Sequence, residues 1–294
     1  NIQKVLDTHA LACYHTTIPN RTRVQIYFVE EEANKMKKFV ALLLAVLMVA
    51  SLCACGQKDT GSDLQTVTKG KLTMSTNAQF PPYESVADDG KGYEGTGFEV
   101  IDIEIAYALA QKLGLELVVD DMDFDSALSA VQTGKSDIVA AGVTVTPERQ
   151  NTMSFTDSYA NGVQVVIVKE GSDIKSIDDL EGKKIGTQRG TTGYIYCSDD
   201  FGDENVVAYD DGLTAVQALN NGQVDAVVID NAPAKEFIAA NPGLKILDTS
   251  YAEEDYAIGM AKNSPLEDAV NSVLEELKAD GTLQAIVDKY ITAE

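Results

Sequence analysis

Residues 127–139 read ALSAVQTGKSDIV, and residues 215–227 read AVQALNNGQVDAV. At an offset of 88 positions (215 − 127), the two stretches share Ala at the first and fourth places, Gly at the eighth, Asp at the eleventh and Val at the thirteenth. Each stretch has the pattern of a helix, a glycine turn and a strand. Such connections are common, so coincidence is one explanation. We favour the other, a structural repeat, which predicts two similar lobes centred on residues 71–160 and 164–250.

Short β-rich runs alternate with helical patterns on both sides of these stretches, which predicts an α/β protein with mostly parallel sheets. The expected strands are 71–76, 115–120, 137–142, 163–169, 184–188, 206–209, 225–229, 244–247 and 256–260. The expected helices are 102–113, 125–133, 191–197, 212–220, 231–240 and 265–279.

The segment after the second lobe has to pack somewhere, and we expect it to return to the first. Lobe 1 would then comprise residues 71–161 and 252–294, and lobe 2 residues 162–251. Two crossings between the lobes would make a hinge. The fold class that follows is α/β, two-lobed, with a two-crossing hinge.

The ends of the repeated strands predict where a ligand binds, because ligands of open α/β sheets bind beyond the carboxyl ends of the strands. AAGVTVTPER follows Val139 and ends on Arg149, whereas VID follows Val227 and ends on Asp230. A cleft between the facing lobes would hold one fixed cation and one fixed anion. A zwitterion suits that pair of charges.

Six segments together resemble a known family. They are STNAQFPPYE (75–84), EIAYALAQKLG (104–114), MDFDSALSAVQTGKSD (122–137), AGVTVTPER (141–149), GTQRGTTG (186–193) and DAVVID (225–230). In order and spacing, the chain from 71 to 290 resembles the bacterial extracellular solute-binding proteins of polar amino-acid ABC importers (family 3). The resemblance implies a type II periplasmic-binding-protein-like fold. It also implies that two closing lobes capture an extracellular amino acid and deliver it to a membrane permease driven by an ATPase.

The resemblance also implies a carboxylate-binding group in this chain. The guanidinium of Arg149 would hold the ligand α-carboxylate, because its planar fork matches two oxygens. Thr144 and the amide of Thr192 would complete that site beside Gly142. Thr191 and Thr192 open an expected helix, whose N-terminal amides favour an anion. The alternatives are a solvated surface Arg149 and a plain helix cap at Thr191.

The remaining implied site residues concern the ammonium and the side chain of the ligand. Asp230 would be the counter-ion of the α-ammonium, and its alternative is a helix N-cap. Phe80 and Phe124 would form walls around the ligand side chain, although a buried Phe is usually core. Asn77 and Gln188 end strands on the same rim and would face the ligand side chain.

Ligand preference follows from the residue at position 77. Many cation-selective relatives carry an acid there, where this chain has Asn77. Amides both donate and accept hydrogen bonds, whereas a buried unpaired cation is costly. We therefore expect a neutral polar or sulfur-containing amino acid, such as glutamine or cystine. Glu84 is the main argument against this expectation, because it lies near enough in sequence to supply a carboxylate for a cationic ligand.

Residues 36–54 have the layout of a lipoprotein signal peptide: Lys37 and Lys38, an apolar run, then Leu-Cys-Ala before Cys55. The resemblance to a lipobox implies that Cys55 is lipidated and becomes the mature N-terminus, anchored to the outer face of the cell membrane. A transmembrane or core helix is the alternative. Residues 55–70 would form a flexible tether, and residues 1–35 an upstream leader that precedes the true start at Met36.

Composition excludes several functions. The net charge of −23 provides no basic footprint for nucleic acid. Both histidines, His9 and His15, fall in the expected leader, which removes His-based nucleophile pairs and metal sites from the mature chain. We expect no enzyme activity, no metal and no cofactor. Two alternatives stay open: a dehydratase-like enzyme of the same fold acting on a cyclic carboxylic acid, and a sensory ligand-binding domain, which would need a second membrane segment.

Overall fold

A computed structural model describes residues 64–291 of the chain. The expected leader, the signal peptide, Cys55 and the tether up to residue 63 lie outside the described residues. The described residues belong to one compact unit, which is built from two five-stranded sheets and one small sheet. Within residues 64–291, no helix has the length and apolar character needed to cross a membrane.

The first large sheet combines parallel and antiparallel strands. Strand β1 pairs in parallel with β5 and β6, and β13 runs antiparallel to β6 and β7. The spatial order is β5 (Glu116–Asp121), β1 (Lys71–Thr76), β6 (Ile138–Val139), β13 (Gly259–Ala261) and β7 (Met153–Phe155). The helices around it are α2 (Ile101–Leu113), α3 (Phe124–Gln132), α4 (Pro147–Thr152), α8 (Glu267–Ala279) and α9 (Thr282–Tyr290). A small antiparallel sheet adjoins it, built from β2 (Gln79–Phe80), β3 (Glu84–Val86) and β4 (Phe98–Glu99), with the 3₁₀ helix η1 (Tyr93–Gly95) in between.

The second large sheet has the same kind of order. Strands β10, β9 and β11 are parallel, and β8 runs antiparallel to β11 and β12. The spatial order is β10 (Val206–Tyr209), β9 (Ile185–Gln188), β11 (Ala226–Asp230), β8 (Ala160–Lys169) and β12 (Leu244–Tyr256). Its helices are α5 (Thr192–Phe201), α6 (Gly212–Asn220) and α7 (Asn231–Ala240), with 3₁₀ turns η2 (Ile177–Leu180) and η3 (Asp203–Asn205).

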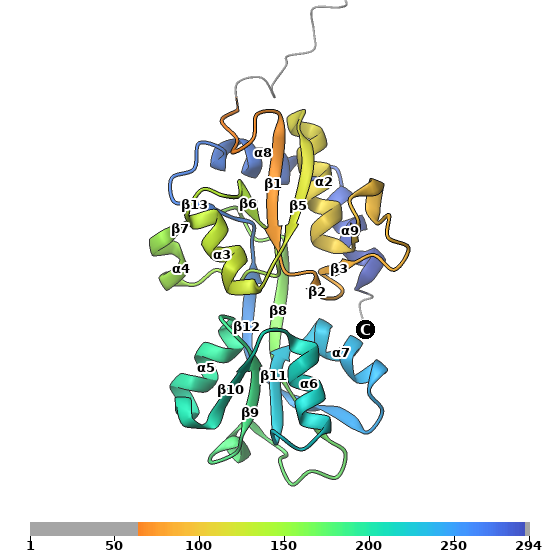
Figure 1. Ribbon diagram of the computed structural model, residues 1–294, viewed down its shortest axis with the longest axis vertical. Coiled ribbons are helices and arrows are strands. Elements are labelled where there is room, and N and C mark those ends of the chain that lie inside the picture. Colours follow the sequence, from red (N-terminus) through yellow and green to blue (C-terminus); the bar gives the residue numbers. More distant parts are fainter. Residues whose placement is uncertain (1–63, 292–294) are drawn as a thin grey trace, which may run out of the picture. The chain divides into compact units, whose positions relative to one another are not determined.

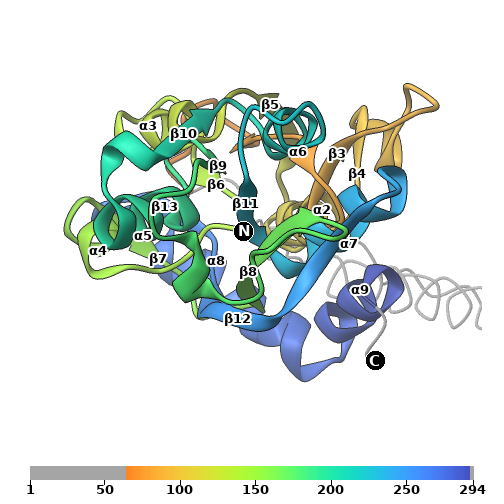
Figure 2. The same cartoon turned by 90° about the horizontal axis from the view of Figure 1, so that it is seen from below.

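Alternate side chains of the second sheet fill two different cores, as a strand period of two requires. Val165 and Ile167 of β8 pack on the side of α6, and Val166 and Val168 pack on the side that holds Cys197 of α5. Figure 2 shows α6 and α7 on one side of the sheet and α5 on the other. A sheet covered on both faces explains the nearly continuous apolar run of β8.

The internal repeat is visible in the structure. Helices α3 and α6 are each nine residues long, and they begin 88 positions apart, at Phe124 and Gly212. Each helix leads through a glycine turn into the next parallel strand, β6 or β11, and those strands also begin 88 positions apart. The two stretches therefore occupy equivalent places in two lobes, one around each large sheet.

Two long strands cross between the lobes. Figure 1 shows β8 and β12 side by side between the upper and the lower sheet, and they pair from Ala160 and Tyr256 to Lys169 and Leu244. The expected fold class, α/β with two lobes and a two-crossing hinge, is the one observed. The boundaries predicted for lobe 1 (71–161 and 252–294) and lobe 2 (162–251) fall inside these two strands and remain a prediction of where the hinge bends.

Several elements differ from the expectations. Strand β12 continues to Tyr256 where residues 244–247 were expected, because the polar segment 250–256 pairs with β8. Helix α4, strand β7, the small sheet and helix α9 were not expected. Residues 64–70, assigned to the tether, lie against lobe 1: Leu64 packs on the core, and the N–H of Val67 donates to Asp137 over 2.7 Å.

Candidate ligand-binding site

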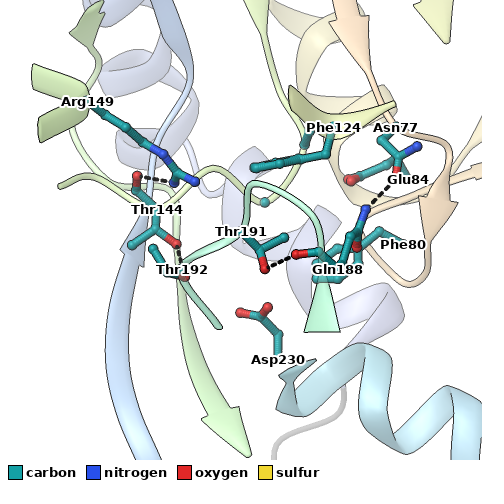
Figure 3. A pocket seen from close by; sticks show the side chains of 12 residues that line it. Asn77, Phe80, Glu84, Phe124, Thr144, Arg149, Gln188, Thr191, Thr192 and Asp230 are labelled. Atoms are coloured by element: carbon teal, nitrogen blue, oxygen red, sulfur yellow. Dashed lines mark hydrogen bonds between the residues drawn. The ribbon is translucent and has the colours of Figure 1, made fainter. Parts of the chain in front are cut away.

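One pocket between the two lobes gathers all ten residues that the sequence predicts for the ligand site (Figure 3). It lies past the carboxyl ends of β1, β6, β9 and β11. Glu84 and Ala141 complete its lining. The ten predicted residues are Asn77, Phe80, Phe124, Gly142, Thr144, Arg149, Gln188, Thr191, Thr192 and Asp230.

Arg149 reaches the pocket from the first turn of α4. Thr146 caps that helix by accepting the N–H of Arg149 over 3.1 Å, with Pro147 at the first helical position. The guanidinium is buried; its Nη1 donates to the carbonyl of Thr144 over 2.8 Å, and Nη2 donates to the carbonyl of Gly190 over 3.1 Å. It also lies over the ring of Phe124, 5.5 Å from the centroid. Burial lowers the pKa of Arg149, but an arginine stays charged in a protein, and its five N–H donors leave some free for a ligand.

The N-terminus of α5 faces Arg149 from the second lobe. Thr191 is the N-cap, and its hydroxyl accepts the N–H of Tyr194 over 3.4 Å and donates to the carbonyl of Gln188 over 2.8 Å. The hydroxyl of Thr192 lies 3.5 Å from the hydroxyl of Thr144 in the first lobe. Helix amides and a guanidinium thus converge on the same space, an arrangement suited to a carboxylate.

Asp230 ends β11 on the opposite side of the pocket from Arg149 (Figure 3). It occupies the N-cap position of α7, but its side chain makes no capping hydrogen bond, so the helix-cap alternative does not account for it. The side chain is buried, and its Oδ1 has no partner within the described chain. Burial raises the pKa of Asp230 to about 8, with a further contribution from the charge of Glu254. A bound cation would supply the missing partner.

Two amides connect the lobes at the far end of the pocket. Nε2 of Gln188 donates to Oδ1 of Asn77 over 2.9 Å, and Nδ2 of Asn77 donates to the carbonyl of Met122 over 3.0 Å. Oε1 of Gln188 is buried and has no partner among the described residues. Both side chains therefore lie where the sequence predicts them, with one acceptor still open.

The apolar walls of the pocket are Phe80 and Phe124, both buried. Gly142 lies against Phe80 with a φ of +53°, and a Cβ there would lie 3.2 Å from the ring. Glycine is needed on both counts, since an L side chain rarely adopts this φ and the neighbouring ring leaves little room. The N–H of Gly142 donates to Asp102 over 3.0 Å, which fixes the loop after β6.

Glu84 was recognised in the sequence only as a threat to the expected ligand preference. In the structure its side chain is 1% exposed and lines the pocket, and neither carboxyl oxygen has a hydrogen-bond partner within residues 64–291. Burial raises the pKa of Glu84 well above its usual range, and the neighbouring Asp102 adds to the shift. The pocket thus has a carboxyl group at the end where the sequence predicts amides alone.

Glu254 on the hinge strand β12 was missed. It is buried, and its Oε2 accepts hydrogen bonds from Thr144 over 3.1 Å and from Gln164 over 2.9 Å. The sequence gives no signal for it, because Glu253, Glu254 and Asp255 are three consecutive acids. Along the strand, Glu254 and Tyr256 are buried while Glu253 and Asp255 are exposed, and this alternation places an acid on the inner face of a crossing strand.

The described residues offer few groups for catalysis or for metal binding. Within residues 64–291, no group of three or more His, Cys, Asp or Glu side chains is placed to hold a metal ion. Cys197 is free and buried, and burial raises the pKa of its thiol to about 12, which makes it a poor nucleophile. The pocket presents ionisable side chains and amides.

The fold and this pocket define a two-lobed binding protein, and comparison identifies the family. Residues 72–293 match the model of the bacterial extracellular solute-binding proteins, family 3, and the chain belongs to this family. Membership confirms the family that the six sequence segments resemble, and with it the role of capturing an extracellular solute for import by an ABC transporter.

Relatives within the family are named for different amino acids. The arginine-binding extracellular protein ArtP of Bacillus subtilis (strain 168) is 33% identical, over 88% of this chain and 100% of its own length. The L-cystine-binding protein TcyJ of Escherichia coli (strain K12) is 32% identical, over 86% and 94%. The solved structure of an ancestral arginine-binding protein bound to glutamine is 39% identical with a TM-score of 0.71, over 77% of this chain and 100% of that one. These likenesses confirm the type II fold class.

Proposed function

We propose that this chain captures a free L-amino acid in the pocket of Figure 3 and delivers it to an ABC permease, which an ATPase drives. The observation that carries the proposal is the pair Arg149 and Asp230, a buried guanidinium and a buried carboxyl on two sides of one pocket. The α-carboxylate would bind Arg149 and the amides at the start of α5. The α-ammonium would bind the unpartnered oxygen of Asp230.

Capture proceeds by closure of the two lobes about β8 and β12. The bonds from Gln188 to Asn77 and from Arg149 to Gly190 join residues of different lobes, so they belong to the closed form. A ligand that touches both lobes favours this form and shifts the open–closed equilibrium toward it. The permease would recognise the closed form.

Arginine is the ligand that we favour, and this departs from the preference for a neutral amino acid drawn from the sequence. The departure rests on Glu84, whose two buried oxygens have no partner among residues 64–291. A guanidinium would satisfy a carboxylate with two parallel N–H donors. Glutamine and cystine are the second choice, supported by the amides of Asn77 and Gln188. The names of the relatives include all three amino acids.

Binding without catalysis fits the pocket better than a dehydratase activity. The relatives compared are named as binding proteins, and the lining residues include no His or Cys to serve as a nucleophile or its base. A dehydratase-like enzyme would have to turn over a cyclic carboxylic acid. A sensory role would require coupling to a signalling domain.

A lipid anchor would hold the protein at the outer face of the cell membrane. The family is extracellular, and the sequence 36–54 followed by Cys55 has the pattern of a lipoprotein signal. Two or more acyl chains give stable anchoring, whereas one chain gives marginal binding. The protein would thus stay near the permease that it supplies.

Isothermal titration calorimetry with the twenty amino acids and cystine tests the binding role and the ligand. We expect L-arginine to bind tightest, with a Kd of about 1 μM or lower. Agmatine, which lacks the α-carboxylate, and 5-guanidinopentanoate, which lacks the α-ammonium, should each bind at least about 30-fold more weakly. Tighter binding of glutamine or cystine would restore the preference for a neutral ligand. If no amino acid binds, the proposed function is wrong.

A further inference from the structure

Two buried carboxyl groups lie next to each other at the base of the pocket, Glu84 on β3 and Asp102 on α2. Both side chains are 1% exposed. The N–H of Asp102 donates to the carbonyl of Tyr83 over 2.8 Å, which ties the two elements together beside Glu84. Only Glu84 lines the pocket, and Asp102 lies behind it.

Asp102 accepts hydrogen bonds from neighbouring residues of the described chain, and Glu84 accepts none from them. Oδ2 of Asp102 accepts the N–H of Gly142 over 3.0 Å and the O–H of Tyr159 over 2.8 Å. Oδ1 of Asp102 and both oxygens of Glu84 are buried, and no N–H or O–H group of another residue within 64–291 donates to them. Within the described chain, these oxygens can therefore hydrogen-bond only to each other, through a proton on one of the two carboxyls, which stabilises Asp102 as the carboxylate and raises the pKa of Glu84.

The charged and titratable groups around the pair do not offset its charge. Acids face Glu84 from β5 (Asp121) and from the start of α7 (Asp230), and tyrosines flank the pair at positions 83 and 159. Neither carboxylate forms an ion pair with a Lys or Arg in the described part of the chain. Two adjacent buried carboxyls without a cation do not both ionise. Burial and the charge of Asp102 both raise the pKa of Glu84, so Glu84 is the carboxyl of the pair that favours its protonated form.

We propose that Glu84 and Asp102 form a proton-binding pair that couples the side-chain charge of the ligand to pH. A cationic amino acid replaces the proton of Glu84, which is released to solvent, whereas a neutral amino acid leaves that proton in place. The inference rests on the proposed function and adds a regulation of the same site. Glu84 contacts the ligand, and Asp102 is a positioning residue that acts through Glu84.

Arginine binding should strengthen with rising pH relative to glutamine binding. Below the titration midpoint of the pair, each unit of pH increase should strengthen arginine binding about tenfold relative to glutamine, since one extra proton is released. Above the midpoint the ratio should level off. Asp230 also holds a raised pKa in the empty pocket, but the α-ammonium of either ligand acts on it equally, so its contribution cancels in the ratio.

Calorimetry with L-arginine and L-glutamine at pH 5, 6, 7 and 8 measures the protons released, when each pH is studied in two buffers that are effective at that pH and differ in ionisation enthalpy. We expect arginine to release up to one proton more than glutamine, and Glu84→Gln to abolish this difference. Glu116→Gln is the control, because that carboxylate is exposed and pairs with Lys71 over 3.1 Å. Equal proton release for both ligands at every pH would overturn the proposal. Absence of binding by both ligands would instead contradict the proposed function.

Two further variants separate the pair from Glu84 alone. Asp102→Asn would keep an oxygen for Gly142 and Tyr159 and turn an N–H donor toward Glu84, so the midpoint should move to lower pH. Tyr159→Phe removes a donor that supports the Asp102 carboxylate, so the midpoint should move to higher pH. The second variant serves if the first fails to fold. An unchanged midpoint in a folded variant would show that Asp102 takes no part.

Discussion

Nη2 of Arg149 in the first lobe donates a hydrogen bond of 3.1 Å to the carbonyl oxygen of Gly190 in the second lobe. Gly190 has a φ of +77°, and a Cβ there would lie 3.1 Å from Cβ of Asp125. The absence of a side chain therefore permits the close approach of the two lobes. The same guanidinium would bind the ligand and, through Gly190, hydrogen-bond to the second lobe when the two lobes close.

Replacing Arg149 by Ala should weaken amino-acid binding about 30-fold or more while the protein remains folded. Loss of one partner of a desolvated charge pair costs roughly 2–5 kcal/mol, because the other charge stays buried without a partner. Calorimetry measures the affinity, and circular dichroism checks the fold. Arg189→Ala is the matched control, since that side chain is about half exposed and lies 3.6 Å from Asp210. Equal losses in the two variants would contradict the assigned role.

Asp230→Asn should also weaken binding by a factor of about 30 or more, because a neutral amide cannot balance the α-ammonium. Asp248→Asn removes an exposed acid from the same lobe and should leave the affinity unchanged. The effect should be the same for arginine and for glutamine, since both carry the same ammonium. A loss confined to arginine would place Asp230 at the ligand side chain.

The unliganded protein should lose stability as the pH rises, and Asp230 is one cause. Its pKa is about 8 in the folded chain, above the ordinary value of 3.8. The folded state therefore binds more protons than the unfolded state between these two pH values, and the free energy of unfolding falls across that window. We compare the free energy of unfolding of Asp230→Asn with that of the wild type at two pH values. The variant's advantage over the wild type should be larger at pH 8.5 than at pH 5, by about 1.4 kcal/mol or more, the equivalent of one pKa unit. Urea unfolding at both pH values measures this, and a difference independent of pH would contradict it.

Gly142→Ala should reduce both stability and affinity, whereas Gly134→Ala should reduce stability alone. Both glycines have a positive φ, +53° and +71°, so each substitution should cost about 1–2 kcal/mol of backbone strain. Only the Cβ at 142 would press on Phe80, because nothing lies within 4 Å of one at 134. We expect a roughly tenfold loss of affinity for the first variant, about 1.4 kcal/mol. Equal affinities would show that the loop after β6 does not shape the pocket.

Cys55→Ser should prevent acylation and leave the protein in the medium or as an unprocessed precursor. Cells grown with radiolabelled palmitate reveal the lipid, and the chain offers a matched control in Cys53, two positions earlier. Cys53→Ser should retain the label. A wild-type protein without label would contradict the lipid anchor.

Much of the site follows from local rules of sequence. The repeated helix–glycine–strand stretches indicate two equivalent strand ends, and the strand-end rule selects the segments that lead to Arg149 and Asp230. Both residues line the pocket of the structure, as do Asn77 and Gln188 at the ends of β1 and β9. A strand end is a local property, because periodicity and the next turn define it.

Elements whose existence depends on distant pairing were missed. The segment 250–256 is polar enough to read as a loop, and it becomes a strand because β8 lies beside it. Glu254 of that strand meets Thr144, 110 positions away in the chain, and no local pattern specifies this contact. The small sheet around Glu84 likewise requires β3 to pair with β2 and β4.

The sequence by itself determined the repeat, the two-lobed fold, the family and the presence of Arg149 and Asp230 at the pocket, because these depend on residue order and on period. Only the tertiary structure decided which acids lose their contact with water. Glu84, Asp102 and Asp230 come from three different elements, and packing places them within one buried region. The charge state of a carboxyl depends on its surroundings in three dimensions, since burial penalises the ionised form and neighbouring acids add to that penalty.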